Sequence, residues 1–79
     1  MTNLEKYNQA FCEAFEITEE KLAGLQYQQI ELWDSVGHMT LIANLEDSFD
    51  IMMETDDIID LSSYEKGMEI LTKKYSIEL

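Results

Sequence analysis

The chain of 79 residues carries 17 acidic and 5 basic side chains, for a net charge of −12, and 46 % of its residues are hydrophobic. This hydrophobic content can form a packed core, while the length predicts one domain over residues 1–79 without a large substrate cavity. A strongly negative field repels phosphate backbones and anionic membranes, so the composition argues against nucleic-acid binding and favours partners with basic surfaces.

The first predicted element is a helix from about Thr2 to Phe15. Its apolar side chains recur at helical spacing: Leu4, Tyr7, Phe11, Ala14 and Phe15. Thr2 and Glu5 form a T-x-x-E capping box in front of them. Cys12, the only cysteine, excludes an internal disulfide and a cysteine-based zinc site, and we expect it to be half-buried in this helix.

A long loop is predicted between the first two helices. Apolar residues between Ile17 and Leu32 are spaced irregularly, and Gly24 interrupts them. One helical turn is expected near residues 19–22. A loop of this length in a small domain either has a function or packs as a compact structure of its own.

The helix predicted after Asp34 has two apolar sides. Turning 100° per residue places the core-facing side chains on one stripe: Leu41, Ile42, Leu45 and Phe49. Val36, Met39 and Ala43 lie on the other side and share it with Glu46, Asp47 and Asp50. An apolar strip rimmed by carboxylates, outside the core, is typical of a docking surface.

Two further helices complete an all-α prediction. A brief third helix begins at Thr55-Asp56-Asp57 and is expected to turn its apolar side chains inward: Ile58, Ile59 and Leu61. In the last helix Tyr64, Met68, Leu71 and Tyr75 step by four, three and four residues. Ser62 and Glu65 form a second predicted capping box. No apolar run approaches the length of a membrane span, and no export signal is visible, so we expect a cytoplasmic monomer without a membrane span.

Ser35 admits three interpretations. Asp34 or Ser35 can cap the second helix, which requires nothing further of the serine. A nucleophile would need a base, but the only histidine, His38, is predicted to face the core, and no carboxylate is placed to orient its ring. The third interpretation is a covalent attachment point, because a phosphate on Ser35 would meet free N–H groups and the positive end of the helix dipole.

The pattern around Ser35 resembles the acyl carrier proteins. Asp34-Ser35-Val36, followed by Met39 and Leu41, fits the family pattern D-S-L/V-x-x-V/M-x-L, and the segment L-E-D-S-F-D from Leu45 to Asp50 follows at the family's spacing. The resemblance extends without a gap from about Ile30 to Leu71 and more loosely over the first helix.

The resemblance implies a right-handed four-helix bundle that carries 4′-phosphopantetheine on Ser35. A phosphopantetheinyl transferase takes this group from coenzyme A, and Asp34 matches the aspartate presented to that enzyme and its metal. The thiol of the arm holds acyl groups as thioesters and passes them to partner enzymes with basic docking surfaces, while the carrier supplies no catalytic residue of its own. The partner surface implied is Val36, Met39, Ala43, Glu46, Asp47, Asp56 and Asp57.

Departures from the family pattern, and one other class of protein, leave alternatives open. Thr40 stands where fatty-acid carriers usually have an acid, Leu32-Trp33 replaces a glycine-containing approach, and Gly37 interrupts the helix. These features favour a free-standing carrier of a specialised pathway; an aminoacyl or peptidyl carrier is the alternative within the family. A small acidic adaptor without a prosthetic group is the alternative outside it. The acids between Glu54 and Asp60 lack the glycine and terminal glutamate of an EF-hand loop.

Overall fold

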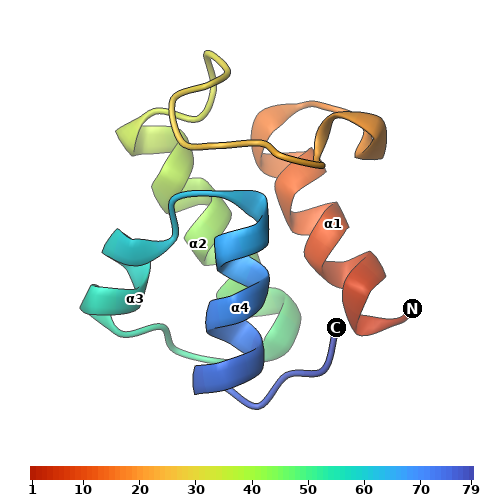
Figure 1. Ribbon diagram of the computed structural model, residues 1–79, viewed down its shortest axis with the longest axis vertical. Helices are drawn as coiled ribbons and strands as arrows, with labels where there is room; N and C mark the ends of the chain where they lie inside the picture. Colours follow the sequence, from red (N-terminus) through yellow and green to blue (C-terminus); the bar gives the residue numbers. More distant parts are fainter.

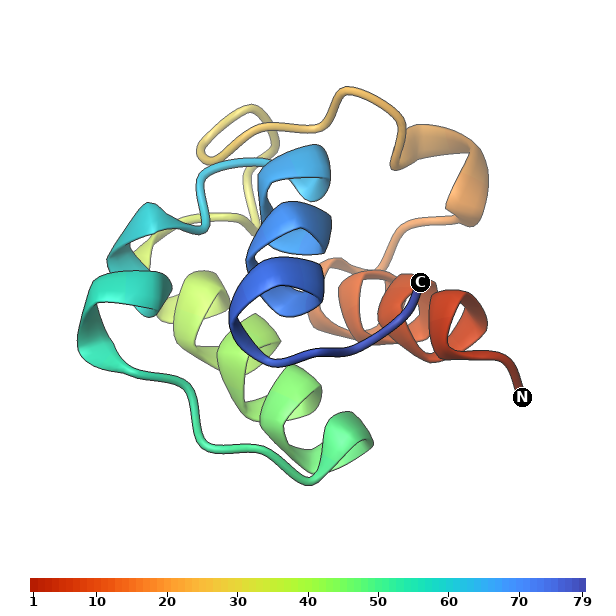
Figure 2. The same ribbon diagram turned by 60° about the horizontal axis from the view of Figure 1, so that its bottom comes forward.

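Four α-helices joined by loops make up the computed structural model, which describes residues 1–79 and contains no β-strand. The helices are α1 (Asn3–Phe15), α2 (Ser35–Phe49), α3 (Thr55–Asp60) and α4 (Tyr64–Lys74). A 3₁₀ turn, η1, spans Glu19–Lys21. α1 and α3 lie on opposite sides of the molecule, with α2 and α4 between them (Figure 1, Figure 2). The predicted small all-helical bundle is confirmed. None of the four helices combines the length with the apolar character that a membrane crossing requires.

The ends of α1 and α4 are fixed by side-chain caps. At α1 the predicted capping box is present: Thr2 Oγ1 accepts the Glu5 N–H at 3.1 Å, and Glu5 Oε1 accepts the Thr2 N–H at 2.8 Å. The bond from the Thr2 N–H to the Glu5 carboxylate lowers the pKa of Glu5. At α4 the predicted box is wrong by one residue, because Ser63, not Ser62, accepts the Lys66 N–H at 3.0 Å. Glu65 instead accepts the Gly24 N–H at 3.0 Å.

The long loop between α1 and α2 is packed against the bundle. Leu22 and Leu25 are buried, and the predicted helical turn is present as η1. Two backbone bonds of 2.8 Å, from Tyr27 N–H to the Ser62 carbonyl and from Tyr64 N–H to the Leu25 carbonyl, fasten the loop to the start of α4. The loop runs across the ends of the helices on the side where α2 begins (Figure 1).

The core is built around aromatic side chains, among them Trp33 at the end of the long loop. Phe15 stacks on Trp33 at a centroid distance of 5.0 Å, and Phe11 meets it edge-on at 5.5 Å. Trp33 has no exposed surface. Burying a large apolar side chain contributes roughly 1.5–3 kcal/mol, so Trp33 firmly anchors the chain two residues before Ser35.

The predicted inward stripe of α2 is confirmed. Leu41, Ile42 and Leu45 are buried, and Phe49 is half-buried against the same core. Asn44 adds a hydrogen bond of 3.2 Å from its amide nitrogen to the Ala10 carbonyl on α1. The orientation of α2 is therefore set from its middle turns, and its first turn projects toward the loop.

Candidate functional site

Ser35 is the first residue of α2, and its side chain is exposed. The cap of this helix is Asp34, whose Oδ1 accepts the Gly37 N–H at 2.8 Å. Ser35 Oγ makes no hydrogen bond, and the N–H groups of Ser35 and Val36 precede the first intrahelical bond. Of the two caps that the sequence allowed, the structure selects Asp34, so capping does not account for the serine.

The backbone in front of Ser35 lies close against the first turn of α2. A Cβ atom at Gly37 would overlap the carbonyl oxygen of Leu32, so this position accepts only glycine without movement of the chain. Trp33 is held by bonds from its N–H to the Ile30 carbonyl at 3.1 Å and from the Gln28 N–H to its own carbonyl at 3.0 Å. Gly37, which is unfavourable for helix propensity, is thus required by the close approach of the Leu32 carbonyl.

His38 is half-buried, as predicted, and both of its ring nitrogens have partners. Nδ1 accepts the indole N–H of Trp33 at 2.9 Å, and Nε2 lies 2.7 Å from the carbonyl oxygen of Ile58 on α3. Because both nitrogens are engaged within the fold, His38 is not available to take a proton from Ser35. The site contains an exposed hydroxyl without an adjacent base.

One side of α2 exposes the apolar residues that the helical projection had separated from the core. Val36 is 75 % exposed and Met39 53 % exposed, and Ala43 and Asp47 are exposed below them. These four residues are referred to as the exposed α2 face. Glu46 lies at its edge and is half-buried, because its Oε2 accepts the Met53 N–H at 2.9 Å. Glu46 therefore also holds the connection between α2 and α3.

The predicted surface role of Asp57 is wrong. Asp57 is only 2 % exposed and points away from solvent, accepting hydrogen bonds from Lys74 Nζ at 2.6 Å and from Tyr75 Oη at 2.7 Å. These two donors hold the pKa of Asp57 below its usual value of 3.8. Asp57 thus fixes α3 to the end of α4, whereas Asp56 is exposed as expected.

Ile59 was predicted to face inward and is instead 71 % exposed. Asp57 and Leu61 are four residues apart and share the inward side of α3, so Ile59, two residues from each, falls on the opposite side. Met52 is 85 % exposed in the connection before α3. The spacing between Ile59 and Leu61 could have predicted from sequence that Ile59 is exposed. Met52 lies outside any helix, so no periodic pattern could have predicted its exposure.

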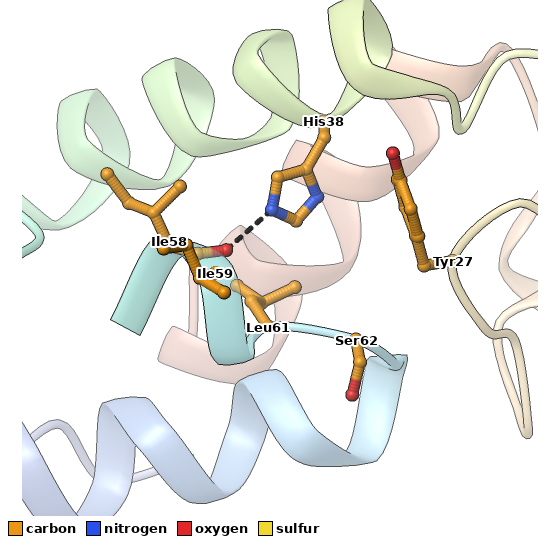
Figure 3. Close-up of a pocket in the computed structure, with 6 residues that line it drawn as sticks. All are labelled: Tyr27, His38, Ile58, Ile59, Leu61 and Ser62. Carbon is orange, nitrogen blue, oxygen red and sulfur yellow. Dashed lines mark hydrogen bonds between the residues drawn. The ribbon is translucent and has the colours of Figure 1, made fainter. Parts of the chain in front are cut away.

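A cavity of about 270 Å³ lies between α2, α3 and the long loop. It is lined by Tyr27, His38, Ile58, Ile59, Leu61 and Ser62. His38 reaches down from α2 toward the Ile58 carbonyl, and Tyr27 faces it from the loop (Figure 3). The sequence did not predict this cavity, because its walls come from three separate segments.

The remaining reactive groups do not add to the site. Cys12 is half-buried in α1. Burial raises the pKa of its thiol, and the negative charges of Glu19 and Glu13 raise it further. No group of three or more His, Cys, Asp or Glu side chains is arranged to hold a metal ion. Comparisons with protein-family models, with curated proteins and with solved structures yield no match.

Proposed function

We propose that the protein is an acyl carrier with the four-helix bundle of that family, bearing 4′-phosphopantetheine on Ser35. A phosphopantetheinyl transferase attaches the group from coenzyme A: the serine oxygen forms a phosphodiester with the arm, and 3′,5′-adenosine bisphosphate leaves. The arm's thiol then carries acyl groups as thioesters between partner enzymes. Departures around Ser35 favour a specialised pathway over fatty-acid synthesis.

The observation that carries this proposal is that Ser35 is exposed and makes no contribution to the fold through a hydrogen bond or a helix cap. Ser35 Oγ has no hydrogen-bond partner, does not cap α2, and has no base beside it. A residue that is modified by another enzyme needs exposure and a fixed position rather than activation within its own chain. The free N–H groups at the start of α2 would also favour the negative charge of an attached phosphodiester.

The exposed α2 face supports a role in docking to other proteins. Its apolar residues, Val36, Met39 and Ala43, are followed by Asp47, and no Lys or Arg occurs between Lys21 and Lys66. An apolar strip with an acidic border suits partners whose surfaces are apolar at the centre and basic around it. Asp34, exposed beside Ser35, is the residue proposed to meet the transferase.

The acidic adaptor differs from the carrier in what it requires of Ser35. As an adaptor, the protein would use the same exposed α2 face and need no prosthetic group. That hypothesis accounted for Ser35 as a helix cap, and the cap is Asp34. The carrier hypothesis is favoured because it gives the serine a function that this geometry permits.

The deciding experiment is attachment of the arm in vitro. The purified protein is incubated with coenzyme A, Mg²⁺ and a broad-specificity phosphopantetheinyl transferase, and its intact mass is measured beside Ser35→Ala and Ser48→Ala. We expect one phosphopantetheine on the wild type and on Ser48→Ala, and none on Ser35→Ala. Ser48 is the matched control because it is exposed on the same helix. Absence of addition to the folded wild type, with a known carrier modified in parallel, would refute the carrier and favour the adaptor.

A further inference from the structure

The only tryptophan and the only histidine of the chain are hydrogen-bonded to each other. The Trp33 indole can only donate and the Ile58 carbonyl can only accept, so His38 between them must accept at Nδ1 and donate from Nε2. This arrangement requires the neutral Nε2–H tautomer. The two rings lie nearly parallel, at 13°, with centroids 6.2 Å apart.

The chain of bonds from Trp33 through His38 to Ile58 connects the segment before Ser35 with α3. No other hydrogen bond joins α2 to α3. On its other side α3 is held by Asp57, which binds Lys74 and Tyr75 of the α4 end. A helix of six residues has little stability of its own, so these bonds and the apolar contacts of Ile58 and Leu61 determine its position.

The same residues fix the turn that presents Ser35. Trp33 is fully buried, and Gly37 lies directly against the Leu32 carbonyl, so the backbone on both sides of the serine is constrained by packing. His38 is one helical turn beyond Ser35 and contacts Trp33 two residues before it. Movement of the His38 ring would therefore affect the serine turn and the wall of the cavity together (Figure 3).

We propose that His38 is a positioning residue, which through its two hydrogen bonds holds the Ser35 turn and α3 in one fixed arrangement. It does not touch the reacting atoms. The consequence for modification of Ser35 rests on the proposed carrier function, whereas the coupling between the serine turn and α3 is a property of the fold and can be measured without it.

The first test uses the wild-type protein labelled with ¹⁵N. Because the chain has one imidazole and one indole, long-range ¹H–¹⁵N spectra contain a single set of signals for each ring. At neutral pH we expect His38 Nδ1 to resonate as an unprotonated acceptor nitrogen and Nε2 as a protonated one, with the Trp33 indole proton slow to exchange. A predominant Nδ1–H tautomer, or rapid exchange of that indole proton, would overturn the proposal.

The second test separates the hydrogen bonds from the bulk of the ring. His38→Gln keeps one acceptor and one donor, whereas His38→Leu fills space but leaves the Trp33 N–H and the Ile58 carbonyl unpaired. In His38→Leu we expect α3 amides to exchange about tenfold faster, with α1 amides unchanged, because loss of a local tether lowers the free energy of local opening. His38→Gln should lie within about twofold of the wild type. Equal behaviour of the two variants would contradict the proposal.

The functional readout is the rate at which the transferase modifies Ser35. For His38→Leu we expect kcat to fall about five- to tenfold with KM nearly unchanged, because the docking face is intact while the serine is less well held. His38→Gln should largely restore kcat. If the wild type is never modified, the carrier function fails, while the tautomer and exchange results still decide the coupling. If His38→Leu does not fold, the wild-type tautomer measurement and the His38→Gln exchange rates decide it.

Discussion

At Gly37 the packing of the backbone outweighs helix propensity. Glycine inside a helix costs about 1 kcal/mol relative to alanine, and the sequence alone therefore marks Gly37 as a weakness. In the fold, the Leu32 carbonyl occupies the space that a Cβ atom would need. The glycine permits the close approach of the loop to the first turn of α2, and this approach places Ser35 directly after the buried Trp33.

We therefore expect Gly37→Ala to destabilise the protein, although alanine is the better helix former. The free energy of unfolding should fall by at least about 2 kcal/mol, since the overlap is with backbone and cannot be relieved by rotation of a side chain. Urea denaturation followed by circular dichroism measures the change. Ser48→Ala, on an exposed position of the same helix, should stay within about 0.5 kcal/mol. A Gly37→Ala variant as stable as the wild type would show that the loop moves away freely.

Among the helices, those that the sequence predicted well are those long enough to show a period. The apolar residues of α1 and α2 recur over several turns. The 100° rotation gave the inward side of α2, and helical spacing gave that of α1 except for Leu4, which is exposed. α3 has six residues, too few for a pattern to distinguish its sides. Its orientation depends on Lys74 and Tyr75, the partners of Asp57, which are 17 and 18 residues away in the chain.

The candidate site likewise has one part that depends on residues close in sequence, which could be predicted, and one part that depends on residues far apart, which could not. Ser35, Asp34 and the exposed α2 face lie within one continuous stretch of sequence, so motif and helical spacing located them. The cavity and the bond from His38 to Ile58 join residues 20 positions apart, and no local pattern encodes such a pairing. Asp57 was placed on the partner surface by the family resemblance, and only tertiary packing shows that it is paired with Lys74 and Tyr75.

The attachment of α3 through Asp57 predicts a specific dependence on pH. Its folded-state pKa is depressed below the ordinary value of 3.8, which applies to the unfolded chain. The stability that Asp57 contributes is therefore present above that value and is lost as pH falls through the folded-state pKa. The loss in urea midpoint caused by Asp57→Asn should therefore be largest at pH 7 and shrink below about pH 4. Asp60→Asn is the matched control, because Asp60 is exposed on the same helix without a hydrogen bond. An equal pH dependence in both variants would contradict the role of Asp57.

On α2, the charge of Asp47 is expected to govern encounters with partners. Asp47 is exposed and makes no hydrogen bond, whereas Glu46 also holds the Met53 N–H, so Asp47→Lys changes charge without freeing a loop. We expect association with a phosphopantetheinyl transferase to slow about three- to tenfold at low salt, with a smaller effect on dissociation. Stopped-flow fluorescence measures both rates. Glu13→Lys, the same charge change at an exposed position of α1, is the control; equal slowing by both would indicate a net-charge effect and place docking elsewhere.

Over the whole molecule the charge is distributed unevenly. Three of the five basic residues are on α4, where Lys66 and Lys73 lie beside Glu69 and Lys74 binds Asp57. The hydrogen bond from Lys73 and the charge of Lys66 lower the pKa of Glu69. The chain from Leu22 to Glu65, which includes α2 and α3, contains no basic residue of its own, and of its carboxylates only Asp57 is paired with a lysine. Most of the unbalanced negative charge therefore lies in the segment of the chain that contains Ser35.

This unbalanced charge should make the folded state more stable as salt is added. Folding brings like charges together, and ions at 0.1 M screen exposed charges more than about 10 Å apart. Between about 10 and 200 mM NaCl we expect the free energy of unfolding to rise by about 1 kcal/mol, measured as a higher urea midpoint. Replacing Glu20 and Glu31, two exposed acids without hydrogen bonds, by glutamine should raise stability at low salt and reduce the salt effect. If instead the wild-type midpoint did not move, repulsion would already be relieved by the paired lysines of α4, and the negative surface would act on partners alone.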